Sequence, residues 1–214
     1  MSDATITTEQ LTGWLRRFRD LVIKNQAELT KLDSAIGDAD HGINMARGMD
    51  AVMQKLDGTY PAVVDELLKT VAMTLLSSVG GASGPLYGTF FLRFGKAAGS
   101  ANELDLVGFA SALRAGLAGV LERGKAEIGD KTMVDALSPA LDEMDAVINK
   151  GGDLAAAVIA AREAAAAGRD ATLPLVARKG RASYLGERSA GHIDPGAAST
   201  SLLFDALAAE LAGS

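Results

Sequence analysis

Three aspartates fall within eight residues near the start of the chain, at Asp33, Asp38 and Asp40. Only one small residue separates Asp38 from Asp40, so a tight turn lets both carboxylates point at one place. Asp33 lies far enough upstream for the backbone to fold back and add a third oxygen. Two unit charges about 6 Å apart at an effective dielectric constant of about 20 repel by roughly 3 kcal/mol. The cluster therefore predicts a bound cation, and a ligand set made only of oxygen indicates a hard ion, Mg²⁺ or Ca²⁺.

An EF-hand does not fit this stretch. With Asp38 as the first loop position, Met49 stands at the twelfth position instead of glutamate, and the sixth position lacks glycine. Mg²⁺ held by a few carboxylates and completed by phosphate oxygens fits better. The alternative is that these aspartates only form turns and cap helices. The presence of His41 and Asn44 beside all three aspartates favours a site.

The composition limits the classes of protein to consider. The 214 residues are 48% hydrophobic but only 5% aromatic, which predicts an aliphatic core in one domain covering residues 1–214. The chain has no cysteine, which excludes disulfides and thiolate zinc sites, and its two histidines exclude a multi-histidine metal site. The net charge of −6 argues against nucleic-acid binding. We see no signal peptide and no apolar run of membrane-span length, so we expect a cytoplasmic protein with no membrane partner.

Helical periodicity runs through most of the chain, so helices are the elements that must position the aspartates. Thr8 is a candidate N-cap without a full capping box, and Pro61 fits a first helical turn. We expect helices over 8–25 with a short continuation at 28–32, then over 42–56, 61–78, 86–98, 104–123, 133–149, 153–167 and 197–211, with another short helix near 171. No stretch alternates as a strand does. The sequence therefore predicts an all-α fold of about eight helices, with neighbours antiparallel because their connections are short.

Two connecting segments have compositions suited to a ligand. Residues 77–85 are the most glycine-rich stretch, and small residues before a helix let an anion approach free N–H groups. An ordinary helix–turn–helix connector is the alternative. Residues 178–196 hold four cations and four glycines without helical or strand periodicity. We expect a long, mobile, positively charged loop there, which is functional or else a solvated linker.

Three local patterns imitate known motifs and are rejected. Residues 119–126 approach the P-loop pattern, but Ala126 replaces its Ser/Thr and a helix precedes it instead of a strand. Residues 81–85 approach the nucleophile elbow, but Pro85 stands in place of its second glycine. His192 and Asp194 suggest a catalytic dyad, although local turn bonding explains their spacing better.

One arrangement uses the aspartates, the glycine-rich turn and the basic loop together. Carboxylates hold Mg²⁺, small residues admit a nucleotide, and arginine neutralises the remaining phosphate charge. Phosphoryl transfer requires little more of a protein than positioning and charge stabilisation. The residues alone thus favour a Mg–nucleotide site.

The chain also resembles the nucleotide-binding L subunit of dihydroxyacetone kinase over about residues 11–211. The resemblance is carried by GDADHG at 37–42, TLLSSVGGASGP at 74–85, RGKA at 123–126 with GDKTM at 129–133, and the segment 177–196. It implies a closed barrel of eight antiparallel helices with ADP at one end. It also implies that Asp33, Asp38 and Asp40 bind two Mg²⁺ ions.

The resemblance further implies a set of residues around the nucleotide. Arg181 would join the three aspartates in the catalytic group and also cover the nucleotide. The remaining expected contacts are His41, Gly42, Ile43, Asn44, Thr74, Ala82, Ser83, Gly124, Met133, Asp194, Pro195 and Gly196.

The same resemblance implies partners and leaves alternatives. In that family a K subunit holds dihydroxyacetone as a covalent adduct to a histidine, and a phosphotransferase-system phosphocarrier, the M subunit, rephosphorylates the bound ADP. We expect a homodimer. The alternatives are an ATP-dependent small-sugar kinase subunit that exchanges its nucleotide, and a non-enzymatic regulator that senses nucleotide.

Overall fold

The computed structural model describes residues 5–59 and 61–213. The expectation that no signal peptide is present rests on residues 1–5. Of these, residues 1–4 lie outside the described range. In the described part of the chain, no helix combines the length and apolar character needed to cross a membrane. Most of this part is helical, as the periodicity predicts.

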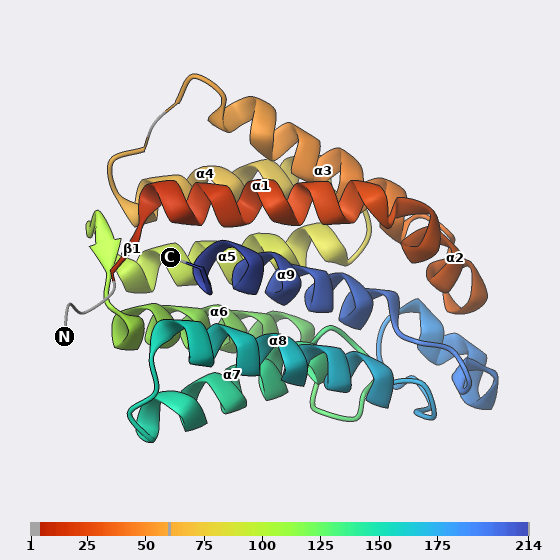
Figure 1. Ribbon diagram of the computed structural model, residues 1–214. Coiled ribbons are helices and arrows are strands. Elements are labelled where there is room, and N and C mark those ends of the chain that lie inside the picture. The colour runs from red at the N-terminus through yellow and green to blue at the C-terminus, as the bar shows by residue number, and fades with distance from the viewer. Residues whose placement is uncertain (1–4, 60, 214) are drawn as a thin grey trace.

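Among the described residues, eight helices pack side by side, and the contacts between neighbours close into a ring. Figure 1 views these helices from the side. In ring order they are α1 (Thr8–Lys24), α3 (His41–Leu56), α4 (Val64–Ser78), α5 (Ser83–Ala98), α6 (Leu106–Gly124), α7 (Val134–Asn149), α8 (Leu154–Ala171) and α9 (Pro195–Leu211). Helix α9 packs against α1 and closes the ring. The predicted barrel of about eight helices is therefore confirmed. Neighbouring helices run in opposite directions, so α3, α5, α7 and α9 all begin at the same end of the barrel.

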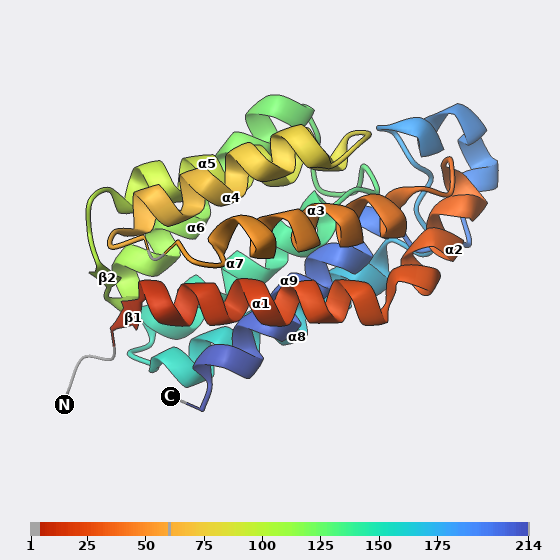
Figure 2. The same ribbon diagram turned by 90° about the horizontal axis from the view of Figure 1, so that it is seen from above.

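Two further elements extend beyond the ring at that end (Figure 2). They are α2 (Gln26–Ile36) and the 3-10 helix η1 (Arg181–Ser189), and they contact each other. A small apolar cluster joins them, made of Ile36, Ala177 and Ala182 with Leu185 packed against it. At the opposite end β1 (Ile6–Thr7) pairs antiparallel with β2 (Glu103–Leu104).

Several predicted boundaries were wrong near the aspartates. The short helical continuation is a full helix that reaches Ile36, so Asp33 lies in a helix and not in a loop. Helix α5 begins at Ser83, three residues earlier than expected, because Pro85 is tolerated in a first helical turn. The segment expected to lack regular structure contains η1, which has a kink at Gly186.

Other boundaries differ farther from the site. The N-cap of α1 is Thr7, which forms a complete capping box with Gln10. Helix α4 begins only at Val64, so Pro61 precedes it. Helix α8 continues to Ala171 and takes up the residues expected to start another short helix. Two very short strands occur where none was expected.

The half of the barrel away from the α2–η1 end is filled by aromatic side chains. Trp14 contacts Phe91, Phe94 and Phe109, with centroid distances of 6.0, 6.3 and 6.4 Å. The indole N–H of Trp14 donates to the carbonyl of Leu203 at 2.8 Å, which links α1 to α9. Four aromatic residues from α1, α5 and α6 thus pack into one cluster.

Candidate functional site

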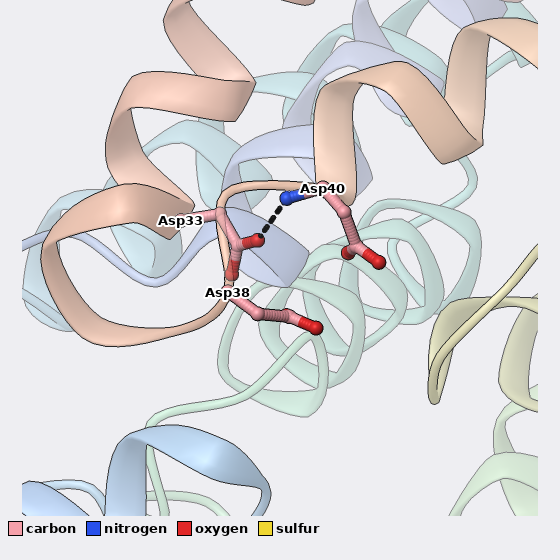
Figure 3. Close-up of side chains that lie close together, drawn as sticks. All are labelled: Asp33, Asp38 and Asp40. Atoms are coloured by element: carbon pink, nitrogen blue, oxygen red, sulfur yellow. Dashed lines mark hydrogen bonds between the residues drawn. The ribbon is translucent and has the colours of Figure 1, made fainter.

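The three aspartates converge where α2 turns into α3 (Figure 3). Each offers a carboxylate oxygen, and these oxygens lie within 4.8 Å of one another. Asp33 is buried, and its Oδ2 accepts the backbone N–H groups of Asp40 at 2.8 Å and His41 at 3.1 Å. Asp33 therefore caps α3 while its carboxylate faces the other two. The predicted carboxylate cluster forms, and its donors are those that a hard divalent cation prefers.

The turn between the aspartates has a backbone that tolerates little change. A Cβ on Gly37 would lie 2.0 Å from Oδ1 of Asp33, so only glycine lets this carboxylate sit against the turn. Ala39 has a φ of 60°, a left-handed conformation that side chains disfavour. This short turn directs the Asp38 and Asp40 carboxylates to the same side.

A pocket of about 360 Å³ opens beside the carboxylates. The first residues of four helices line it, namely those of α3, α5, α7 and α9. The N-terminus of a helix carries a partial positive charge and unpaired N–H groups. The N-cap of α5 is Ala82, which has no side-chain acceptor for those groups. Side-chain oxygens of Asp33, Thr132 and Asp194 already accept N–H groups at the starts of α3, α7 and α9. The uncapped start of α5 is therefore the part of this pocket that offers N–H groups to an anion such as phosphate, while the other three helices add their partial positive charge.

Most of the residues expected at the metal ions or at the nucleotide line this pocket. They are Asp33, Asp38, Asp40, His41, Ala82, Ser83, Gly124, Met133, Arg181, Asp194, Pro195 and Gly196. These residues come from five parts of the chain, and the fold brings them together.

Four of the expected residues do not line the pocket. A Cβ on Gly42 would lie 2.2 Å from the Gln26 carbonyl, so this glycine lets α3 pack closely on α2. The Ile43 side chain is about half exposed. Asn44 accepts from Arg47 at 2.7 Å, and Thr74 donates to the carbonyl of Thr70 at 2.8 Å. A nucleotide contact for Gly42, Ile43, Asn44 and Thr74 stays a prediction.

His41 anchors a buried polar network beneath the pocket. Its Nδ1 lies 3.0 Å from Ser83 Oγ, and its Nε2 lies 2.9 Å from Ser199 Oγ. Ser199 Oγ also lies 2.8 Å from the hydroxyl of Tyr87, which in turn lies 3.1 Å from Thr200 Oγ1. Burial lowers the pKa of His41 to about 4 and raises the pKa of Tyr87 to about 12. Both rings are therefore neutral near pH 7, and His41 joins α3, α5 and α9 at the floor of the site.

Arg181 links η1 to the aspartate turn. Its guanidinium lies 3.1 Å from Oδ2 of Asp38. The side chain of Arg181 is 65% exposed, so this ion pair contributes little to stability, but it places a positive charge at the pocket mouth. The predicted proximity of the basic segment and the carboxylates is confirmed.

Asp194 is the acidic residue at the start of α9. Its Oδ2 accepts the backbone N–H of Ala197 at 2.7 Å, so its carboxylate caps α9, as local turn bonding predicts. Burial raises the pKa of Asp194 to about 7, against the effects of this hydrogen bond and of nearby Lys131.

Several residues that line the pocket were not predicted from the sequence. Leu86, Tyr87, Val120 and Val134 give it an apolar wall, while Arg123, Lys131 and Lys179 bring cations. The apolar residues have helical spacing, so they are indistinguishable from core residues in the sequence. Lys131 belongs to the GDKTM segment at 129–133, which carries part of the family resemblance and could have indicated that this lysine lies at the site.

Comparisons with known proteins agree with this geometry. Residues 35–209 match the DAK2 domain family. The chain is 45% identical over 208 residues to the PEP-dependent dihydroxyacetone kinase, ADP-binding subunit DhaL, of Escherichia coli K12, covering 95% of this chain and 97% of that one. It is 44% identical to the PTS-dependent dihydroxyacetone kinase, ADP-binding subunit DhaL, of Lactococcus lactis, covering 94% of this chain and 97% of that one.

A solved structure shares the fold. The dihydroxyacetone kinase of C. freundii in complex with AMP-PNP and Mg²⁺ superposes with a TM-score of 0.73 at 29% identity, over 96% of this chain and 34% of that one. The family match, the near full-length similarity to DhaL subunits and the shared fold place this chain among the ADP-binding subunits of dihydroxyacetone kinases, which are phosphotransferases of the DAK2 domain family.

Proposed function

We propose that this chain binds ADP or ATP with Mg²⁺ and transfers a phosphoryl group to dihydroxyacetone held on a K subunit, giving dihydroxyacetone phosphate. The observation that carries this proposal is the meeting of three carboxylates, within 4.8 Å of one another, with a pocket lined by four helix N-termini. Carboxylates alone would suit many cations, and helix N-termini alone would suit many anions. Together they suit a phosphate chain with its divalent cation.

The negative charge of the carboxylate cluster and a bound ADP is about what two Mg²⁺ ions and Arg181 would neutralise. Three carboxylates and a fully ionised ADP sum to about −6, which two Mg²⁺ ions and Arg181 bring close to neutrality. Asp33, Asp38 and Asp40 would hold the ions, which would supply electrostatic stabilisation of the phosphates. Asp33 is pre-positioned by its bonds to the backbone of α3, so binding does not need to order it.

The chain's own residues would hold the rest of the nucleotide. The uncapped N-terminus of α5 would contact the phosphates, with Arg181 at the mouth of the pocket. Leu86 and Val120 of the apolar wall, together with Met133, offer a surface for a planar base. The cation charge, the helix dipoles and Arg181 would stabilise the charge that develops on the transferred phosphoryl group.

We further propose that a phosphotransferase-system phosphocarrier, the M subunit, rephosphorylates ADP in place. Identities of 42–46% to PEP- and PTS-dependent subunits support this source of phosphate. Triokinase/FMN cyclase of Rattus norvegicus and L-erythrulose kinase of Pectobacterium atrosepticum are less similar, at 34% and 35% identity. We propose that residues 1–214 act as one domain and that two copies form a dimer, which light scattering would test.

The deciding experiment is to purify the protein without added nucleotide, denature it and quantify the released nucleotide by anion exchange. We expect about one ADP per chain, because a carrier-fed kinase keeps its nucleotide as a cofactor. An empty protein that binds ATP reversibly would instead favour an ATP-dependent kinase. A protein that binds neither nucleotide would contradict the proposal.

Turnover separates a kinase from a nucleotide-sensing regulator. With a K subunit, the phosphocarrier proteins, phosphoenolpyruvate and dihydroxyacetone present, we expect dihydroxyacetone phosphate to form only when this chain is added. Retained ADP without any product would identify a regulator.

A further inference from the structure

The loop between α6 and α7 carries a lysine that the proposed function does not use. Lys131 is 1% exposed, which is rare for a lysine without a dedicated set of partners. It also lines the pocket, where a lysine is ordinarily assigned to a phosphate. The bonds that its ammonium makes indicate a different role.

The ammonium group of Lys131 donates to three backbone carbonyls. These belong to Thr172 at 2.7 Å, Leu175 at 3.1 Å and His192. An ammonium has three N–H donors and no acceptor, so the three carbonyls use its whole capacity. Lys131 therefore has no N–H left for a phosphate and acts on the ligand through the chain that it holds.

The three carbonyls lie on either side of one segment. We call residues 176–191 the arm; it contains η1 and carries Arg181 to Asp38. Leu175 immediately precedes the arm and His192 immediately follows it, so one ammonium joins its two ends. Two backbone hydrogen bonds support the same closure: Gly191 N–H donates to Leu173 at 2.8 Å, and Arg178 N–H donates to Asp130 at 3.1 Å.

The loop that carries Lys131 is braced independently of its side chain. Asp135 accepts the N–H groups of Gly129 at 2.5 Å and Thr132 at 2.7 Å. This bracing holds Lys131 at a φ of 64°, in the left-handed region that side chains disfavour. A substitution that removes only the ammonium thus leaves the loop supported and removes three of the hydrogen bonds that fasten the arm.

We propose that Lys131 is a positioning residue that fastens both ends of the arm and thereby sets how long a nucleotide stays in the pocket. The first half of this proposal stands on the hydrogen bonds alone. The second half rests on the proposed function, because it requires that a nucleotide binds there.

The first test follows amide hydrogen exchange in nucleotide-free protein. In Lys131→Met we expect exchange in residues 177–191 to be about tenfold faster or more, because three charged hydrogen bonds are lost, with exchange in α1 and α5 unchanged. Lys125→Met is the matched control. Lys125 lies in the same loop, also has a positive φ, is exposed and does not line the pocket, so its variant should match the wild type.

The second test measures release of bound ADP and restores the ammonium chemically. We expect Lys131→Met to release ADP about tenfold faster or more. The chain has no cysteine, so Lys131→Cys creates one thiol. Alkylating that thiol with 2-bromoethylamine in denaturant forms an S–C bond with loss of bromide, and refolding then returns an ammonium at the length of lysine. We expect recovery of slow exchange and slow release, and wild type treated in the same way should not change.

The outcomes separate the two halves of the proposal. Unchanged exchange in the arm of Lys131→Met would overturn the positioning role. Faster ADP release with unchanged exchange would show that the ammonium acts on the ligand directly. Faster exchange in a protein that binds no nucleotide would support the fastening and contradict only the proposed function. If Lys131→Met does not fold, Lys131→Gln keeps two N–H donors and should give an intermediate increase in exchange; exchange equal to that of wild type would overturn the proposal.

Discussion

The two ends of the barrel bury different kinds of side chain. Around Trp14 the interior is aromatic, and the indole N–H donates to the carbonyl of Leu203. At the end where α2 and η1 lie, the interior contains Asp33, His41, Lys131 and Asp194. Burying such groups costs stability unless each is paired. The comparison shows that the aromatic end of the barrel stabilises the fold, while the polar end forms the pocket for a ligand.

The largest effect should come from the carboxylate cluster. Asp38→Ala removes one of three converging carboxylates, so we expect nucleotide retention in Mg²⁺ to fall by more than about hundredfold. Stability of the nucleotide-free protein should be unchanged or slightly higher, because like-charge repulsion is relieved. Nucleotide content after purification and thermal unfolding measure the two effects.

The matched control is Asp57→Ala, which removes an exposed aspartate at the end of α3. It should retain wild-type ADP. Unchanged ADP content in Asp38→Ala would contradict the metal assignment.

The aromatic end should show the opposite result. Trp14→Ala leaves a cavity beside Phe91 and Phe94, so we expect a loss of about 3–5 kcal/mol in the free energy of unfolding. The folded fraction should still bind about one nucleotide per chain. Denaturant unfolding and nucleotide titration measure these quantities, with Val107→Ala, an exposed residue at the start of α6, as the control within about 0.5 kcal/mol. Loss of nucleotide affinity in folded Trp14→Ala would show that the two ends are coupled.

A smaller effect is expected from the pocket mouth. Arg181→Ala removes an exposed cation, so we expect phosphoryl transfer to slow about tenfold with a milder loss of binding and no change in stability. Turnover with the K subunit and an ADP titration separate the two effects. Arg188→Ala lies on the same element but away from the pocket, and it should behave as wild type. Turnover of Arg181→Ala at the wild-type rate would remove the arm from the mechanism.

The smallest effect concerns pH. The folded pKa of Asp194 is raised to about 7, so its contribution favours the folded state below its unfolded pKa of 3.8 and is lost as pH rises toward 7. The folded pKa of His41 is lowered to about 4, so its contribution is present above its unfolded pKa of 6.5 and is lost as pH falls toward 4. These opposite slopes should leave wild-type stability nearly flat between these values.

Asp194→Asn tests this balance because asparagine still accepts a hydrogen bond at an N-cap. With chelator and without nucleotide, we expect its free energy of unfolding to rise by on the order of 1–3 kcal/mol between pH 4 and 6.5, because Asp194 no longer opposes the contribution of His41. The raised pKa of Asp205 still acts in the opposite direction and keeps the rise below the full effect of His41. Urea unfolding at several pH values measures this. Parallel profiles for wild type and Asp194→Asn would refute the opposing titrations.

The amino-acid sequence alone determined the fold class, most of the helices and the position of the carboxylate cluster. Helical periodicity predicted the all-α fold and most of the helices, because each helix buries one regularly spaced apolar face. The spacing of Asp33, Asp38 and Asp40 predicted their convergence, because a short turn limits where neighbouring carboxylates can point. These features depend on residues close together in the chain.

Only the tertiary structure decided the rest. The ring order brings four helix N-termini to one pocket. Local sequence patterns do not predict which helix termini will lie together. The close packing of Gly42 against the Gln26 carbonyl is likewise visible only in the folded chain, since the direction of a helix face depends on its neighbours. Lys131 would be taken for a surface or phosphate-binding lysine from its sequence. The partners of its ammonium are three backbone carbonyls more than forty residues away. Because every residue has a backbone carbonyl, only the folded structure determines which three accept hydrogen bonds from Lys131.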